Sequence, residues 1–349
     1  MALHEAPPPS LAPLSLVVTR RETLCDDIVA FELRHPDGAE LPAFEAGAHI
    51  DLHLPAAEGG PGSAPRRRSY SLCNRPAERF RYLIAVQREA AGRGGSAWLH
   101  AHLQVGDRIG VGAPRNLFAL RPADGSTPRH LLLAGGIGLT PLLAMAEVLW
   151  AAGRPFELRV CVRSAQRLPF AQRLAEAPWA GCVHVHADDA GPALDLPALL
   201  AQQSAGTRAY CCGPAGFMAA VQRAAADAGW PADRVVVEHF AAPASPAATA
   251  HVEPGHFELD WAPTGQRLVV GPADSVARVL LAAGIEVPIS CEQGICGQCC
   301  LQVEAGEADH RDLVYGAHEH EVERRFTPCC SRAHSPRLSL APLGWVAPD

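Results

Sequence analysis

The segment CEQGICGQC, residues 291–299, decides the fold of the last part of this chain. It gives Cys291, Cys296 and Cys299 a C-x4-C-x2-C spacing, and Cys329 follows 30 positions after Cys299. Plant-type [2Fe–2S] sites have this arrangement, because two irons need four thiolate ligands in addition to the bridging sulfides. The two glycines inside the segment let the backbone fold closely around such a group. The spacing therefore predicts a [2Fe–2S] cluster bound by these four cysteines.

Other interpretations of these cysteines are a zinc site and structural thiols. Zinc sites favour a C-x2-C pair at both ends, whereas one such pair is present here, so the cluster is the preferred interpretation. Cys300 and Cys330 each stand next to a predicted ligand, and Cys330 is the alternative to Cys329 as the fourth ligand. His318 and His320, each followed by a glutamate, are interpreted as an exposed helical face rather than as a metal site.

The composition of the whole chain is that of a globular protein with two or three domains. It has 349 residues, of which 48% are hydrophobic and 19% charged, and its net charge is −7. No apolar run approaches the ~20 residues of a membrane helix, and no secretory signal is visible at the start. The sequence pI of about 6.1 argues against nucleic-acid binding. We therefore expect a cytoplasmic protein, in which clustered cysteines bind metal more often than they form disulfides.

A linker divides the chain. Residues 241–254, AAPASPAATAHVEP, consist mostly of small residues and include three prolines, which predicts a semi-stiff spacer. The part after it, residues 255–349, holds six of the twelve cysteines and carries 13 acidic and 7 basic residues, a net charge of −6. A change of character near residue 125 predicts a further boundary. The expected domains are residues 1–125, 126–240 and 255–349.

Each predicted domain has its own pattern of strands and helices. In residues 1–125, short strand-like runs separated by Gly, Pro and Asn indicate an antiparallel β-barrel or sandwich. These runs are residues 16–19, 28–33, 49–54, 69–73 and 82–87. In residues 126–240, strands alternate with helices, which indicates a parallel α/β sheet. In residues 255–349, strands at 256–260 and 267–270 and a helix at 275–283 indicate a small mixed α/β domain, with Asp274 or Ser275 as the helix N-cap.

Two motifs of the α/β region are candidates for nucleotide binding. In HLLLAGGIGLTP, residues 130–141, a buried strand enters a glycine-rich turn, with Thr140 as the predicted N-cap of the next helix. Glycines let a pyrophosphate approach the backbone, and a helix N-terminus favours its charge. CCGP, residues 211–214, is predicted at the carboxyl end of a strand, where open α/β sheets bind ligands. The alternatives are an ordinary strand–helix turn and a cysteine that serves only packing.

Two motifs of the β region are candidates for phosphate and ring binding. In RRRSYSL, residues 66–72, Arg68 can pair with a phosphate, Tyr70 can lie on an aromatic ring and Ser71 offers a hydroxyl. GRGGS, residues 92–96, precedes a predicted helix whose N-terminus suits a phosphate. The alternatives are an exposed charged face and a hairpin turn.

The order of these motifs resembles the phthalate dioxygenase reductase family, which includes vanillate demethylase reductases and belongs to the ferredoxin–NADP reductase superfamily. The resemblance rests on RSYSL, AVQREAAGRGGS, AGGIGLTP, CCGP, CEQGICGQCC and CCSRA, which together span nearly the whole chain. It implies a multidomain fold with an antiparallel β-barrel that binds FMN, a parallel-sheet α/β domain that binds NADH, and a β-grasp ferredoxin domain with the cluster.

The resemblance also implies which residues form these sites. For FMN they are Arg68, Ser69, Tyr70, Ser71, Ala85, Val86, Gln87, Gly94, Gly95 and Ser96. For the nicotinamide nucleotide they are Gly135, Gly136, Gly138, Thr140, Cys212, Gly213 and Pro214. Ser71 near flavin N5, Cys212, and Phe240 near the flavin ring are the implied catalytic residues. The family's CVSRA motif aligns Cys329 with the cluster ligand.

Two positions depart from the family pattern. Gln87 stands where some relatives have lysine. Arg163 and Ser164 follow the second predicted α/β strand, where some relatives have an aspartate that bonds the adenine ribose. An Arg–Ser pair can tolerate a 2′-phosphate, so NADPH is possible besides NADH.

The expected function is that of the reductase component of a two-component Rieske non-haem iron oxygenase acting on an aromatic or similar small compound. Electrons would pass from NAD(P)H to FMN, then singly to the [2Fe–2S] cluster and on to the oxygenase. We expect a monomer that meets its partner transiently through the acidic cluster domain. The alternatives are a reductase for an amine, carnitine or diiron oxygenase, and a non-catalytic redox sensor.

Overall fold

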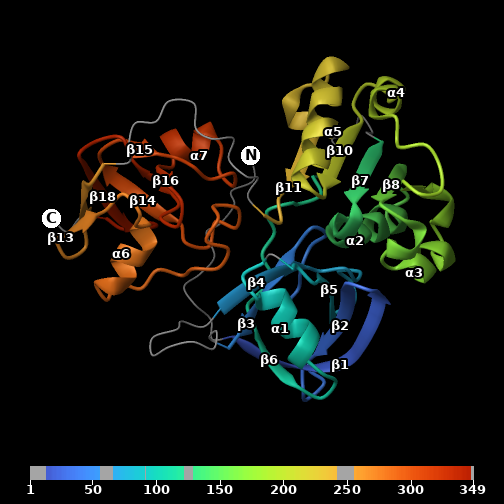
Figure 1. Ribbon diagram of the computed structural model, residues 1–349, viewed down its shortest axis with the longest axis horizontal. Coiled ribbons are helices and arrows are strands. Elements are labelled where there is room, and N and C mark those ends of the chain that lie inside the picture. The colour runs from blue at the N-terminus through green and yellow to red at the C-terminus, as the bar shows by residue number, and fades with distance from the viewer. Residues whose placement is uncertain (1–12, 56–65, 91, 122–128, 242–254, 347–349) are drawn as a thin grey trace. The chain divides into compact units, whose positions relative to one another are not determined.

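The computed structural model describes residues 13–55, 66–90, 92–121, 129–241 and 255–346 (Figure 1). Its contacts divide the chain into two compact units, Leu11–His239 and a second unit that contains Phe240–Asp349. The predicted boundary near residue 125 and all of the predicted linker except Ala241 lie outside the described residues, so the domain limits stay predictions. Among the described helices, none is long and apolar enough to cross a membrane.

The first sheet is antiparallel and closes into a barrel. Its strands are β1 (Leu14–Cys25), β2 (Ile28–Arg34), β3 (His49–Leu54), β4 (Arg66–Ser71), β5 (Tyr82–Gln87) and β6 (Arg108–Val111), in the order β4-β3-β6-β1-β2-β5. The two edges meet where the Cys73 N–H donates to the Leu83 carbonyl, 2.8 Å away. Helix α1 (Gly95–His102) follows β5. The predicted barrel is confirmed, and β6, a four-residue strand between glycine-rich turns, was not expected from the sequence.

The second sheet is parallel and lies between two helical layers. Its strands are β7 (His130–Gly135), β8 (Phe156–Val162), β9 (Val183–Ala187), β10 (Arg208–Cys212) and β11 (Val235–Glu238), in the order β11-β10-β7-β8-β9. Its main helices are α2 (Leu139–Ala151), α3 (Ala171–Glu176), α4 (Leu196–Ala201) and α5 (Ala215–Asp227) (Figure 1). Leu132 packs with residues of α2, whereas Leu131 and Leu133 pack with residues of α4 and α5. Strand β7 reads as a continuous apolar run because both of its faces are covered.

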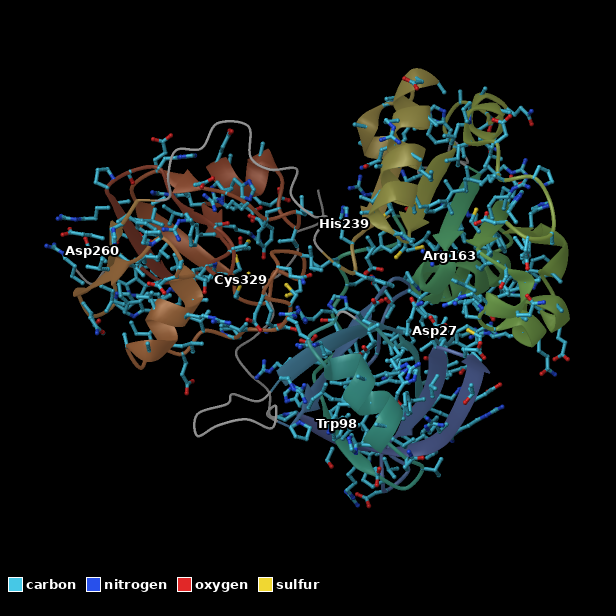
Figure 2. All side chains as sticks on the ribbon, viewed as in Figure 1. Asp27, Trp98, Arg163, His239, Asp260 and Cys329 are labelled. Carbon is cyan, nitrogen blue, oxygen red and sulfur yellow. The ribbon has the colours of Figure 1, made fainter. Side chains whose placement is uncertain are left out.

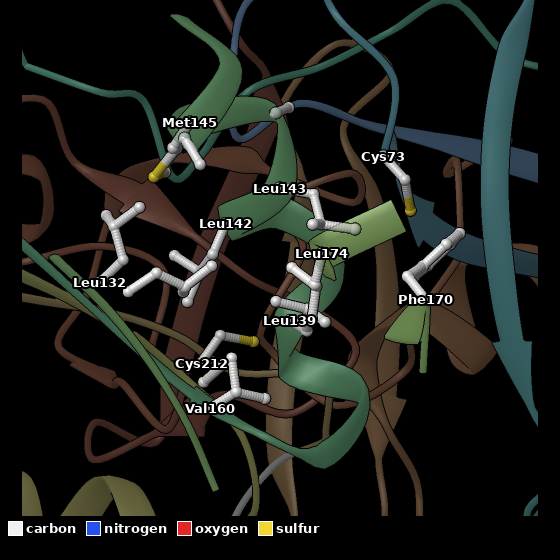
Figure 3. Close-up of a cluster of buried hydrophobic side chains, with 14 of the residues drawn as sticks. Cys73, Leu132, Leu139, Leu142, Leu143, Met145, Val160, Phe170, Leu174 and Cys212 are labelled. Atoms are coloured by element: carbon white, nitrogen blue, oxygen red, sulfur yellow. The ribbon is translucent and has the colours of Figure 1, made fainter. Parts of the chain in front are cut away.

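The barrel and the parallel sheet share one hydrophobic cluster. Ile28, Ala46 and Phe118 of the barrel side belong to the same cluster as Leu139 and Phe170. Figure 3 shows members of this cluster, including Cys73 of the barrel side. The polar rim of this junction includes two ion pairs, Arg167–Asp27 at 2.5 Å and Arg75–Glu147 at 3.8 Å. The barrel and the parallel sheet therefore form one compact unit.

The C-terminal unit is an α+β fold around a mixed sheet. Its main sheet has the order β13-β12-β18-β14-β16, in which β12 and β18 run parallel. The strands are β12 (Phe257–Trp261), β13 (Gln266–Val270), β14 (Leu301–Ala305), β16 (Arg325–Phe326) and β18 (Arg337–Pro342), and β15 (Ala308–Asp309) pairs with β17 (Arg332–Ala333). Helix α6 (Val276–Ala282) starts after Ser275, whose side chain caps it, and α7 covers Ala317–Glu321. The predicted β-grasp class is confirmed. The sequence indicated only the first two of these strands, β12 and β13.

Candidate functional site

The two glycine motifs of the parallel sheet meet at the point where its strand order reverses. Strand β7 continues into a 3-10 turn (Gly136–Gly138) and α2, whereas the neighbouring β10 continues through Gly213 into α5. A Cβ on Gly138 would lie 2.1 Å from the Cys212 carbonyl oxygen. A Cβ on Gly135 would lie 2.8 Å from Cδ of Pro214. The predicted residues of the two motifs are thus brought together, backbone against backbone, at the place where α/β sheets bind nucleotides.

One local detail of this turn differs from the prediction. Thr140 was expected to be the N-cap of the helix, but α2 begins at Leu139 with Gly138 as its N-cap. The Thr140 hydroxyl instead donates to the Ile137 carbonyl at 3.0 Å, and the residue is buried. The N-cap prediction is therefore wrong, because the 3-10 turn places the helix start earlier than the Thr-Pro pair indicates.

Cys212 is a buried, neutral thiol. It is fully buried at the end of β10. Burial raises its pKa well above the usual value, and the neighbouring Glu238 and Cys211 raise it further. At neutral pH the side chain can therefore offer a small apolar surface to a ligand, but it is not a thiolate nucleophile.

Glu238 is a functional candidate that sequence reasoning missed. It ends β11 and stands opposite Cys212 in the parallel ladder. Its Oε2 atom is buried and has no hydrogen-bond partner among the described residues, and burial raises the pKa of the carboxyl to about 8. A carboxyl that is neutral at pH 7 can donate a hydrogen bond. The only sequence signal was an acidic residue at the end of the apolar run VVVE, which points to no particular chemistry. Phe240, two residues later, is 43% exposed and is grouped with the C-terminal unit.

The predicted phosphate residues of the barrel meet at the start of α1. Gly94 adopts a left-handed conformation with φ of 76° and forms the N-cap of α1. A Cβ on Gly95 would lie 2.7 Å from Nε of Arg68, and one on Gly94 would lie 3.2 Å from Nη1 of Arg66. Two guanidinium groups and a helix N-terminus therefore face the same small space, which suits a phosphate. Ser96 accepts a hydrogen bond from the Glu89 N–H at 3.0 Å.

The hydroxyls of the RRRSYSL motif have different surroundings. The Ser69 hydroxyl donates to Oδ1 of Asp51 at 2.6 Å, and Arg115 holds the other carboxylate oxygen at 2.7 Å. Ser71 is buried at the end of β4, and its hydroxyl makes no hydrogen bond within the described part of the chain. Tyr70 packs against the barrel core, and burial raises the pKa of its phenol. Ser71 is thus the serine of this motif whose hydroxyl is available to a ligand.

The predicted residues of β5 line the side of the barrel next to the parallel sheet. Ala85 and Val86 are buried. Gln87 donates from Nε2 to Oδ2 of Asp27 at 2.9 Å, and the same oxygen pairs with Arg167. Gln87 therefore takes part in the junction between the two sheets.

The four predicted cluster cysteines converge in the C-terminal unit (Cys329 is labelled in Figure 2). Side-chain hydrogen bonds link Cys291 to Cys296 and to Cys329, and Cys329 also to Cys299. These contacts lower the pKa of the Cys291 thiol, to about 2, and raise that of Cys329. Cys296 and Cys299 are buried. Four cysteines that are joined by these pairwise contacts, three on one loop and one on a distant segment, form a donor set that fits a [2Fe–2S] cluster.

The neighbouring cysteines are held by other groups. The Cys330 Sγ lies 3.4 Å from the Thr327 hydroxyl, and a Cβ on Gly294 would lie 2.5 Å from that sulfur. Cys300 has a side-chain hydrogen bond with Tyr315, and burial raises the pKa of its thiol to about 11. Cys329 has contacts with two of the other three predicted ligands, which favours it over Cys330 as the fourth.

Comparisons with known proteins agree with this layout. The family described as "2Fe-2S iron-sulfur cluster binding domain" matches residues 259–334, and "Dimethylamine monooxygenase subunit DmmA-like, N-terminal domain" matches residues 114–235. The chain is 43% identical over 330 residues to vanillate O-demethylase oxidoreductase of Pseudomonas sp. (strain HR199 / DSM 7063), covering 94% of this chain and 99% of that protein.

Similar solved structures cover nearly the whole chain. Phthalate dioxygenase reductase, described as a modular structure for electron transfer from pyridine nucleotides to [2Fe–2S], has a TM-score of 0.68 and 36% identity, covering 94% of this chain and 98% of that one. A type IV self-sufficient cytochrome P450 monooxygenase has a TM-score of 0.81 and 36% identity; the match covers 94% of this chain and 41% of that one.

Proposed function

The chain belongs to the phthalate dioxygenase reductase family of flavin and iron–sulfur oxidoreductases, and on that premise we propose that it is the reductase component of a two-component Rieske non-haem iron oxygenase. The observation that carries the proposal is the presence of three sites in one chain. These are the arginine and glycine cradle at α1, the backbone contact between Gly138 and Cys212, and the four converging cysteines. The expected partner chemistry is hydroxylation or demethylation of an aromatic compound.

The proposed flavin is FMN, and the proposed nucleotide is NADH. A bound flavin would supply hydride acceptance from the nicotinamide and stepwise release of electrons. Arg66 and Arg68 at the start of α1 would hold the single phosphate of FMN. The Ser71 hydroxyl would donate to the flavin ring, and Tyr70 would lie along it. Cys291, Cys296, Cys299 and Cys329 would hold the cluster.

The turn between Gly135 and Gly138 would hold the pyrophosphate of the nucleotide. Arg163 and Ser164 follow β8 at the carboxyl end of the sheet, where the adenine ribose of a dinucleotide binds (Arg163 is labelled in Figure 2). No acidic side chain occupies these two positions to repel a 2′-phosphate. We therefore propose that NADPH is accepted as a slower substrate, and initial rates with each nucleotide measure the preference.

The proposed function is tested by measuring the cofactor content and the transfer of electrons from NADH to acceptors. Purified protein should contain flavin and iron, and should reduce cytochrome c with NADH. With its oxygenase, NADH-dependent product formation should follow and should slow as ionic strength rises, because the C-terminal part carries a net charge of −6. Reduction of dichlorophenolindophenol, a small dye that needs no oxygenase, is the control. It shows how far salt slows electron transfer within the reductase itself. A purified protein without flavin would contradict the proposal and favour a redox sensor.

A haem protein is the second candidate acceptor. The chain matches 41% of a cytochrome P450 monooxygenase at a TM-score of 0.81, which favours haem as an electron acceptor for this type of reductase. The two candidates are distinguished by supplying each class of oxygenase and measuring product formed per NADH consumed. Tight coupling with the haem protein alone would replace the Rieske proposal.

We also propose that this reductase is a cytoplasmic monomer whose complex with its partner is transient. None of the cysteines in the described part of the chain forms a disulfide, as is usual in a reducing compartment.

Glu238→Gln is expected to remove a pH dependence of nucleotide binding. In the wild type the carboxyl is neutral below its pKa of about 8 and can donate a hydrogen bond to the nucleotide; above that pH it ionises and loses the donor. The KM for NADH should rise about tenfold between pH 7 and pH 9.5, the equivalent of ~1.4 kcal/mol for one hydrogen bond. Glutamine stays neutral and keeps the donor, so its KM should stay level.

Steady-state kinetics across this pH range check the prediction, with Glu176→Gln, an exposed glutamate on α3, as the matched control. An unchanged rise of KM in Glu238→Gln would show that another group titrates.

A further inference from the structure

Two histidines of the C-terminal unit stack on each other beside the cysteine loop. The rings of His310, which follows β15, and His320, on α7, have centroids 3.8 Å apart and an interplanar angle of 16°. His320 Nε2 lies 3.1 Å from Oδ1 of Asp312, whose side chain is fully buried. His320 is itself largely buried, so the sequence-based interpretation of it as part of an exposed face is wrong. His318, on the same helix, is 70% exposed and fits that interpretation.

Asp312 connects this histidine pair to both segments that hold cluster cysteines. A Cβ on Gly294, within the cysteine loop, would lie 2.9 Å from Cα of Asp312. The Leu313 N–H donates to the Gly294 carbonyl at 2.9 Å. The Thr327 hydroxyl donates to Oδ1 of Asp312 at 3.1 Å and belongs to the segment that leads to Cys329. A charge on His320 therefore lies a few contacts away from the cluster position.

The arrangement suits a proton better than a metal ion. One ligand atom each from His310, Asp312 and His320 lie within 4.8 Å of one another, which is close enough for a cation. However, nearly parallel stacked rings direct their nitrogen lone pairs side by side, whereas metal ligation needs them to converge on one point. Both carboxylate oxygens of Asp312 also accept hydrogen bonds, from Thr327 and from the Tyr315 N–H.

The two stacked rings differ in their partners. Two imidazolium rings 3.8 Å apart would repel each other. Burial lowers the pKa of His310, and the neighbouring His320 lowers it further. His320 has the buried Asp312 carboxylate as its partner. Asp309 and His334 also act on the charge of His310, and the Tyr315 ring, over which the Arg325 guanidinium lies, packs edge-on against His320.

We propose that His320 takes up a proton from water when the neighbouring [2Fe–2S] cluster accepts an electron, and releases it when the cluster is oxidised. This rests on the proposed cluster at Cys291, Cys296, Cys299 and Cys329. One electron and one proton enter together, so the net charge of the region is unchanged. His320 acts through Asp312 as a residue that tunes the cluster, and reduction becomes easier at lower pH.

The test is a spectroelectrochemical titration of the purified holoprotein between pH 5.5 and 8.5. At a fixed electrode potential, the ratio of reduced to oxidised cluster should fall up to tenfold for each unit by which the pH rises. A tenfold change corresponds to 59 mV for one electron. In His320→Gln the amide can still donate to Asp312 but cannot titrate, so the ratio should not change with pH. His318→Gln, the matched histidine on the same helix, should keep the wild-type slope.

Three outcomes would overturn the proposal. A cluster that is present but has a pH-independent potential in the wild type would contradict this proposal alone. A pH dependence that survives in His320→Gln and disappears in His310→Gln would show that His310, and not His320, takes up the proton. A folded protein with no cluster absorbance would contradict the cluster assignment and this proposal together. The visible absorbance and iron content of each variant show whether its site has assembled.

Discussion

Cys329→Ser is expected to abolish the visible absorbance of the [2Fe–2S] cluster and the NADH-driven reduction of cytochrome c. The Cys329 thiol contacts those of Cys291 and Cys299, so it completes the set of four sulfurs. A serine hydroxyl is a much poorer ligand than a thiolate for the irons of such a cluster. The iron content should fall from two per chain to near zero, while flavin absorbance and NADH-dependent dye reduction should remain.

Cys330→Ser is the matched control for this prediction. The Cys330 sulfur lies against Thr327 and Ser331, and serine can replace it in such hydrogen bonds. This variant should keep its iron and its cytochrome c activity. Loss of the cluster in Cys330→Ser together with its retention in Cys329→Ser would reverse the ligand assignment.

Gly138→Ala is expected to lower kcat/KM for NADH by about 100-fold. The added Cβ would lie 2.1 Å from the carbonyl oxygen and 2.3 Å from the carbonyl carbon of Cys212. These are backbone atoms, so the turn and β10 must move apart. A misplacement of ~1 Å in a binding site can cost about 100-fold in rate. The φ of Gly138 is −60°, so close approach rather than conformational freedom requires the glycine.

Gly181→Ala is the control, because a Cβ there would meet no atom within 4 Å. Steady-state kinetics with NADH give the effect, and flavin content and the thermal unfolding midpoint show whether the fold is retained. Wild-type kinetics in a folded Gly138→Ala would mean that the contact between the two motifs does not form the nucleotide site.

The sequence was informative where the determining residues are close together in the chain. Three of the four predicted cluster cysteines lie within nine residues. Ser275 indicates the start of its helix because N-capping is a local interaction. The contact between Gly138 and Cys212 joins residues 74 positions apart, and the sequence alone could only place each motif at a strand end. The family resemblance then suggested that they meet.

The site features that the sequence did not indicate depend on burial and on partners. The run VVVE does not tell whether its carboxyl is exposed, whereas in the structure the Oε2 atom of Glu238 is buried and burial raises the pKa of the carboxyl to about 8. The motif RSYS contains two serines of equal appearance, yet Asp51 binds the hydroxyl of Ser69 and leaves that of Ser71 available. His320 looked like an exposed residue because its partner Asp312 precedes it by eight positions and a turn brings them together.

The hydrophobic cluster shared by the barrel and the parallel sheet limits how this reductase can be rebuilt. Ile28, Ala46 and Phe118 pack against the same apolar side chains that hold α2 on its sheet. A nucleotide-binding sheet transplanted from another reductase would have to present matching shapes at this surface, or leave cavities that cost stability. The two parts are therefore exchangeable only as a pair, so a change of nucleotide preference is better engineered by residues at the sheet's carboxyl edge than by replacing the whole sheet.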